Sequence, residues 1–171
     1  MQARSPSKIK IGLILGRFQP FHKGHLYLIK KALECVDKIV IAVGSSDKSD
    51  GDNPLSYTVR AKMLKKVIVE EGLSDRVVKI VPLPDNPSNE AWLKQLLKNT
   101  GGFDTLFGNN AWPNEILEQA GYEVVTVPYM NRTRYRGVSI RRLLRKGGNW
   151  QSRVSAYLID FIAKKMPFDT D

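Results

Sequence analysis

Two histidines and an arginine lie close together in residues 16–25, whose sequence is GRFQPFHKGH. An apolar run from Ile9 to Leu15 precedes this segment and predicts a buried strand, and Leu26 to Cys35 predicts a following helix. A strand-to-helix turn presents backbone N–H groups and the positive end of a helix dipole, which favour phosphate. His22 and His25 are three residues apart, so both can face one anion if they lie in the first helical turn. The segment therefore predicts a phosphate-binding turn.

The same segment resembles the first signature of the nucleotidyltransferases that carry a His-x-Gly-His motif. In form it is most similar to that of archaeal-type nicotinamide-nucleotide adenylyltransferases. The resemblance implies an enzyme that joins ATP and nicotinamide mononucleotide, giving NAD and pyrophosphate. It also implies that the triphosphate is held by Arg17, His22 and His25, which are the candidate catalytic residues here. The candidate ATP-binding residues of this segment are Gly16, Arg17, Phe18, His22, Gly24 and His25.

Six arginines gather between residues 132 and 145, which is more than solubility requires. Arginine matches phosphate oxygens well, although a solvated helix face would have a similar pattern. Within this stretch, the sequence from Ser139 to Arg142 opens a predicted helix and resembles the second signature of the family. The resemblance implies that Arg141 is catalytic and holds the β- and γ-phosphates of ATP, with Ser139 and Arg142 as further ATP-binding residues. Arg136 and Val138 depart from the family pattern, where serine and threonine are usual.

Three further segments are candidates for binding the mononucleotide. Asn89 is a good helix N-cap and Trp92 suits a core, but the resemblance implies that Asn89 reads a carboxamide and Trp92 stacks on a nicotinamide ring. Gly108 and Asn109 follow a predicted strand, where the family places a Gly-Asn pair against nucleotide; an Asx turn of Asn109 and Asn110 that caps the next helix is the alternative. Arg60 resembles a phosphate-binding arginine of the family, but it also begins an amphipathic pattern typical of a surface helix.

Strand-like and helical patterns alternate along the chain, which is typical of βαβ units with a mostly parallel sheet. We therefore predict a Rossmann-like α/β fold with an open five-stranded sheet and helices on both faces. The carboxyl ends of its strands would carry the ligand. The predicted strands are Ile9–Leu15, Lys38–Val43, Val77–Val81, Thr105–Phe107 and Glu123–Val127. The predicted helices are Leu26–Cys35, Thr58–Glu71, Ala91–Asn99, Pro113–Ala120, Ser139–Lys146 and Gln151–Lys165.

Composition places the chain among globular proteins. It has 171 residues, 42% hydrophobic and 26% charged, and its net charge of +10 favours acidic partners such as phosphates. We expect a flexible tail over residues 1–8 and a single domain over 9–171. The loop from Ser45 to Ser56 is long enough for a lid or a binding loop. Cys35, the single cysteine, lies in a helical pattern that predicts a buried packing residue and a cytoplasmic protein.

Other chemistries have little support in the sequence. There is no zinc-ligand set, no P-loop and no Gly-x-Ser-x-Gly elbow. We expect magnesium as the cofactor, held mainly by substrate phosphates, and no protein metal site. We also expect no membrane partner, no specific nucleic-acid partner and, from the resemblance, a homo-oligomer. Two alternatives stay open: the same chemistry on FMN or pantetheine phosphate or as a cytidylyl transfer, and a non-catalytic module that binds nucleotide or nucleic acid.

Overall fold

The computed structural model describes residues 8–166, so nearly all of the expected tail of residues 1–8 lies outside the described residues. A five-stranded sheet forms the centre of the fold, with strand order β3-β2-β1-β4-β5. Every neighbouring pair is parallel, as the alternating pattern predicts. The strands are β1 (Ile11–Gly16), β2 (Lys38–Val43), β3 (Val77–Pro82), β4 (Thr105–Gly108) and β5 (Glu123–Thr126).

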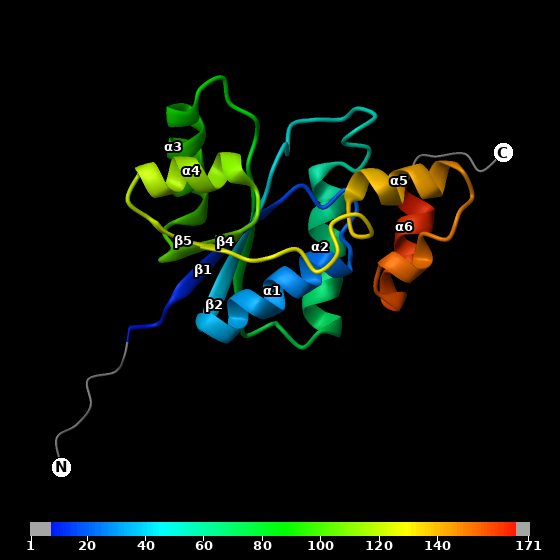
Figure 1. Cartoon of the computed structure of the whole chain (residues 1–171), viewed down its shortest axis with the longest axis horizontal. Helices are drawn as coiled ribbons and strands as arrows, with labels where there is room; N and C mark the ends of the chain where they lie inside the picture. Colours follow the sequence, from blue (N-terminus) through cyan, green and yellow to red (C-terminus); the bar gives the residue numbers. More distant parts are fainter. Residues whose placement is uncertain (1–7, 167–171) are drawn as a thin grey trace, which may run out of the picture.

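Helices cover both faces of this sheet (Figure 1). Because successive strand residues point to opposite faces, Ile14 packs into one apolar core and Leu13 into the other. The first core is completed by α1 (Lys23–Cys35), α2 (Tyr57–Glu70), α5 (Gly137–Arg145) and α6 (Ile159–Lys165). The second core is completed by α3 (Asn89–Thr100) and α4 (Ala111–Gln119). The predicted fold class is therefore confirmed.

Several element boundaries differ from the prediction. Helix α1 begins at Lys23 rather than Leu26, because His22 caps it. The predicted helix Gln151–Lys165 is instead two short 3-10 helices, Gln151–Arg153 and Ala156–Leu158, followed by α6. The prediction that Cys35 is buried is wrong. Cys35 is the last residue of α1, and its side chain is exposed.

The order of the strands reverses at β1, because the chain passes from β1 to β2 on one side and later returns to β4 on the other. Open parallel sheets bind ligands at such a point, beside the carboxyl ends of the strands. Here these ends are Gly16 of β1 and Gly108 of β4. Among residues 8–166, none of the helices combines the length and the apolar composition that a membrane span needs.

Candidate active site

His22 and His25 form a reciprocal cap at the start of α1. The backbone N–H of His25 donates to Nδ1 of His22, and the backbone N–H of His22 donates to Nδ1 of His25, both at 3.3 Å. The two rings stack with their centroids 3.7 Å apart. A Cβ atom at Gly24 would come to 3.0 Å from the His22 ring. Glycine at this position therefore avoids crowding of the ring, and the reciprocal hydrogen bonds fix both rings.

This cap determines which nitrogen of each ring carries the proton. Because both Nδ1 atoms accept hydrogen bonds, a neutral ring has its proton on Nε2 and offers that N–H as a donor. Burial lowers the pKa of His22 from 6.5 to about 3. Burial, with a contribution from His22, also lowers the pKa of His25 well below its ordinary value. At neutral pH the site therefore presents two uncharged N–H donors rather than two cations.

The start of α5 supplies a second group of donors. Its N-cap residue, Arg136, makes no side-chain cap hydrogen bond, so the first N–H groups of the helix lack that partner. Arg141, one turn further on, is 2% exposed, and its Nη1 donates to the carbonyl oxygen of Gln19 at 2.8 Å. Gly137 allows this approach, since a Cβ there would come within 3.0 Å of both groups. The helix terminus and the guanidinium are thus suited to the same anion.

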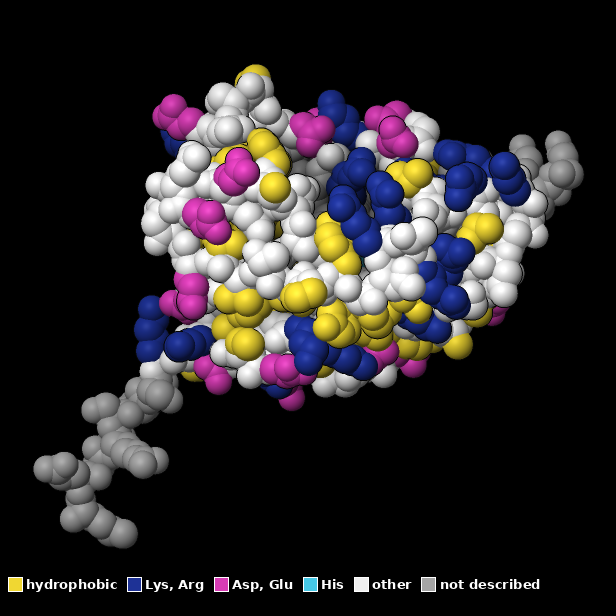
Figure 2. All heavy atoms as spheres, viewed as in Figure 1, with side chains coloured by type: hydrophobic (Ala, Val, Ile, Leu, Met, Phe, Trp, Pro, Cys, Tyr) yellow, Lys and Arg dark blue, Asp and Glu magenta, His cyan; other side chains and the backbone are white. Residues whose placement is uncertain are grey.

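A cavity of about 580 Å³ joins these two groups. Arg17, Phe18, His22, Gly24 and His25 line it from the first turn, and Gly137 and Arg141 line it from α5. The segments that follow β4 and β5 complete the lining with Asn109, Asn110, Ala111 and residues 127–132. Figure 2 shows many Lys and Arg side chains gathered on the side of the molecule where α5 lies, whereas Asp and Glu side chains are scattered singly over this face. This charge distribution favours a polyanion in the cavity.

A smaller cavity of about 240 Å³ adjoins the first at the carboxyl ends of β1, β2 and β3. Trp92 and Trp112 form an aromatic wall there, with ring centroids 4.8 Å apart and a tilt of 60°. Trp92 is 6% exposed and also packs in the second core, while Trp112 is 48% exposed. Leu15, Arg17 and Asn110 line both cavities. The two cavities therefore meet at these three residues, of which Arg17 is the charged one.

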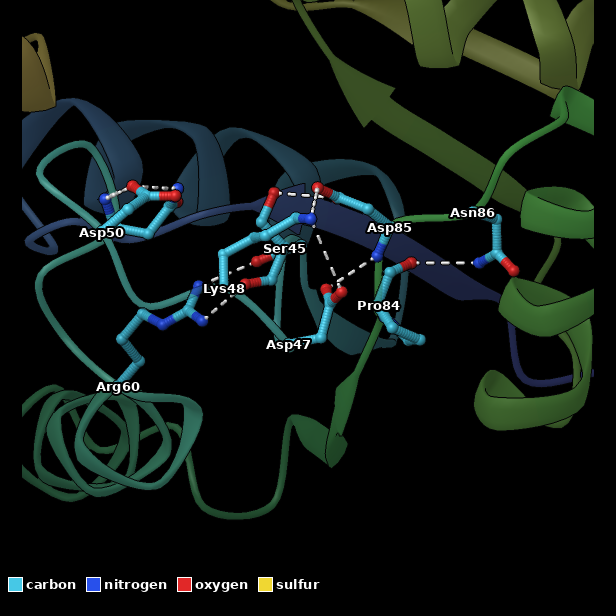
Figure 3. A network of polar contacts seen from close by, with 10 residues as sticks. Ser45, Asp47, Lys48, Asp50, Arg60, Pro84, Asp85 and Asn86 are labelled. Carbon is cyan, nitrogen blue, oxygen red and sulfur yellow. Dashed lines mark hydrogen bonds and ion pairs between the residues drawn. The ribbon is translucent and has the colours of Figure 1, made fainter.

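Arg60 lies in neither cavity. Its side chain is fully buried and donates to main-chain carbonyl oxygens of Arg17, Gly44 and Ser45, at distances of 2.8, 2.8 and 3.1 Å. Burial, together with the nearby charge of Arg17, lowers the pKa of Arg60 to about 10. The surface-helix interpretation of this residue is thus wrong. Figure 3 shows Arg60 directed from α2 toward Ser45, at the start of the 45–56 loop.

The remaining predicted residues are divided between the cavities and their surroundings. Gly16 lines the smaller cavity rather than the larger. Asn89 is exposed in the first turn of α3, and the N-cap there is Ser88, which corrects the N-cap interpretation of Asn89. Asn110, not Asn109, caps α4, through a hydrogen bond from the backbone N–H of Trp112. Five candidates line neither cavity: Arg60, Asn89, Gly108, Ser139 and Arg142.

Sequence reasoning missed three residues that shape the site. Trp112 follows Asn110 by two residues, and its ring lies against that of Trp92. Tyr135 lies beside the His22 ring, with centroids 6.5 Å apart. Gln19 exchanges two hydrogen bonds with the backbone of Leu55, at 2.8 and 2.9 Å, which ties the 45–56 loop to the first turn. A polar Gln inside an aromatic motif was the available signal for this last role.

The fold, with its histidine-capped turn after β1, is that of a nucleotidyltransferase. Residues 13–139 match the model of the family described as cytidylyltransferase-like. The chain is 37% identical to the nicotinamide-nucleotide adenylyltransferase of Saccharolobus solfataricus, over 88% of each chain. It is 36% identical to the enzyme of the same name from Ignicoccus hospitalis, over 88% of this chain and 89% of that one. The chain therefore belongs to the family of nicotinamide-nucleotide adenylyltransferases.

A solved structure agrees with this fold. A bifunctional NMN adenylyltransferase/ADP ribose pyrophosphatase from Francisella tularensis superposes with a TM-score of 0.74 at 24% identity, over 90% of this chain and 50% of that one. The chain thus spans about half the length of that protein. The same Francisella enzyme, complexed with AMP and a manganese ion, gives a TM-score of 0.71 at 25% identity, over 90% of this chain and 49% of that one.

Proposed function

We propose that this chain is an adenylyltransferase that joins ATP and nicotinamide mononucleotide to give NAD and pyrophosphate. The observation that carries the proposal is the pair of adjoining cavities that meet at Arg17. The larger cavity has the donors that a triphosphate requires, and the smaller one has an aromatic wall suited to a flat pyridine ring. The names of the relatives support the same activity.

The reaction needs no protein nucleophile. An oxygen of the mononucleotide 5′-phosphate forms a bond to the α-phosphorus of ATP, and the bond from that phosphorus to the bridging oxygen of pyrophosphate breaks. Arg17 lies at the junction, where the two phosphates have to meet. His22 and His25 donate hydrogen bonds from Nε2 to the triphosphate. Arg141, together with the N-terminus of α5, balances the charge on the leaving pyrophosphate. Catalysis then comes from positioning and electrostatic stabilisation.

A divalent ion, magnesium in our proposal, fits a site of this composition. Among residues 8–166 there is no group of three or more His, Cys, Asp and Glu side chains that could hold a metal. The cavity lining is instead basic and binds phosphates, so the ion would be carried by the phosphate oxygens of the substrates. When bound, it would neutralise charge on those oxygens. Arg17, His22, His25 and Arg141 would then hold the phosphates that carry the ion.

Other parts of the account extend the same proposal. Trp92 and Trp112 enclose the pyridine ring, while the assignment of its carboxamide to Asn89 stays a prediction because Asn89 is exposed outside the cavity. Assembly with further copies of the chain and a place in the cytoplasm also stay predictions. The alternative of a non-catalytic nucleic-acid module is disfavoured, since Arg141 is buried in the wall of a cavity rather than spread over the surface.

Product analysis tests the proposal directly. The chain is incubated with ATP, magnesium and nicotinamide mononucleotide, and the mixture is supplied to an NAD-dependent dehydrogenase with its own substrate. We expect reduced cofactor to accumulate in proportion to the mononucleotide consumed. ATP consumption without any dinucleotide would contradict the proposal and indicate another acceptor or simple hydrolysis.

A further inference from the structure

Asp52 places its carboxylate on Arg141, the buried arginine of the phosphate site. The distance from Asp52 Oδ1 to Arg141 Nη2 is 3.3 Å. The two side chains differ greatly in exposure, with 3% for Arg141 and 79% for Asp52. The arginine is therefore fixed in the protein, and the carboxylate reaches it from a loop at the surface.

The guanidinium of Arg141 has one edge available for an anion. Its Nη1 is committed to the carbonyl oxygen of Gln19. Its Nε is buried and has no hydrogen-bond partner among the described residues. The Nε and Nη2 atoms form the fork that a phosphate or carboxylate fits with two parallel hydrogen bonds. Asp52 uses only the Nη2 arm, at a long distance, so this fork is half occupied.

The loop that carries Asp52 is held in this arrangement by its own hydrogen bonds. Oδ1 of Asp50 accepts from the backbone N–H groups of Asp52 and Asn53, both at 2.9 Å, and from the side-chain amide of Asn53. Figure 3 shows Asp50 within this tight turn. Arg145 Nη2 donates to the carbonyl oxygen of Gly51 at 2.9 Å. The tip of the loop is thus directed onto α5.

We propose that Asp52 is an affinity-determining residue, a built-in carboxylate that occupies Arg141 until the triphosphate of ATP displaces it. This inference rests on the proposed function, because it assumes that the triphosphate uses Arg141. A phosphate that satisfies both Nε and Nη2 replaces a carboxylate that satisfies only Nη2. The two anions also repel each other, so both cannot remain close to the same fork. Asp52 therefore weakens the binding of ATP and of the product pyrophosphate, and it favours pyrophosphate release.

Charge-matched variants of the full chain test this role. Affinity is measured for α,β-methylene ATP with magnesium and, separately, for pyrophosphate, both in the absence of the mononucleotide. We expect Asp52→Asn to bind each ligand about three- to tenfold more tightly, because a neutral amide no longer competes for the arginine. Asp52→Glu, which keeps the charge, should remain close to the unchanged chain.

Asp75→Asn is the control for net charge, since Asp75 is exposed in the turn before β3, at the opposite end of the sheet. Its affinity should not change. Equal or weaker binding by Asp52→Asn would overturn the proposal, and so would equal tightening by Asp75→Asn. A higher magnesium requirement in Asp52→Asn would overturn it in favour of a metal-binding role. Absence of adenylyl transfer with ATP binding intact would contradict only the proposed function, and absence of binding by the unchanged chain would overturn both.

Discussion

The guanidinium of Arg60 donates to the carbonyl oxygen of Arg17 at 2.8 Å, so a buried side chain of α2 fixes the residue at which the two cavities meet. The same guanidinium holds the carbonyl oxygens of Gly44 and Ser45 at the end of β2. It thereby ties the β1–α1 turn to the start of the 45–56 loop. Arg60 is a positioning residue, and its effects on the chemistry pass through Arg17.

Replacing Arg60 should therefore damage both the fold and the site. Arg60→Met removes three hydrogen bonds to main-chain carbonyl oxygens, and we expect a loss of about 3 kcal/mol in the free energy of unfolding. The KM values for both substrates should rise, because Arg17 serves both cavities. Urea unfolding and steady-state kinetics measure these effects. Lys62→Met, which removes an exposed cation from the same helix, is the control and should alter neither; unchanged kinetics in Arg60→Met would contradict the positioning role.

His25→Ala should lower turnover by about 100- to 1000-fold, which is typical for loss of one preorganised donor. It also removes the acceptor for the backbone N–H of His22, so a small loss of stability accompanies it. His25→Asn separates the two roles, because its amide oxygen can replace Nδ1 as acceptor while no donor remains at the position of Nε2. We expect His25→Asn to be nearly as stable as the unchanged chain and as inactive as His25→Ala. Near-full turnover in either variant would refute the proposed donor.

The histidine pair should also make stability depend on pH. Burial lowers the pKa of His22 to about 3 and holds that of His25 well below its ordinary value, whereas both titrate near 6.5 in the unfolded chain. Below about pH 6.5 the unfolded state thus binds more protons, and the free energy of unfolding falls by about 1.4 kcal/mol per pH unit for each histidine. The contribution of the two histidines to stability is fully present above about pH 6.5 and is lost progressively as the pH falls below that value.

Urea unfolding at pH 7.5, 6 and 5 measures this slope. The double variant His22→Asn, His25→Asn keeps acceptors at the cap but cannot titrate in this range, so its slope between pH 7.5 and 5 should be much smaller. Equal slopes in the two proteins would show that the histidines do not cause the acid sensitivity.

Trp112 offers a cleaner test of the smaller cavity than Trp92 does. Trp92 is nearly buried, so Trp92→Ala should raise the KM for the mononucleotide and also destabilise the fold by about 3–5 kcal/mol. Trp112 is half exposed, and Trp112→Ala should raise the same KM several-fold with little change in melting temperature. The KM for ATP should change little in Trp112→Ala. An equal rise in the KM values for both substrates in Trp112→Ala would indicate that the two tryptophans have a purely structural role.

The sequence predicts the sheet and the phosphate turn well for physical reasons. Buried parallel strands need apolar runs, and the Gly-rich turn with two histidines has few structural alternatives. The start of α1 was missed because His22 is an unusual cap, whose role depends on a partner, His25, in the same turn. Arg60 was misread because a charged residue in an amphipathic pattern predicts exposure. Only tertiary contacts reveal its burial, since Arg17 is 43 residues away in the chain.

Asp52 shows the same limit. An acidic residue in a polar loop predicts nothing about an arginine 89 positions further along the chain, and the pairing follows only from the arrangement of the loop on α5. Cys35 is a related case, because helical periodicity places it beside apolar residues but cannot show that its side chain is exposed at the end of α1.

Pyrophosphate release from ATP and magnesium, measured with a panel of acceptors, tests the central claim most directly. The acceptors are nicotinamide mononucleotide, its nicotinic acid analogue, FMN, pantetheine phosphate and none. The account predicts release only with the pyridine mononucleotides, and the ratio of the two rates gives the preference for the base. Release with FMN or pantetheine phosphate but not with the pyridine mononucleotides would contradict the assignment of the two adjoining cavities to ATP and a pyridine mononucleotide. The absence of pyrophosphate release with every acceptor of the panel would contradict it as well.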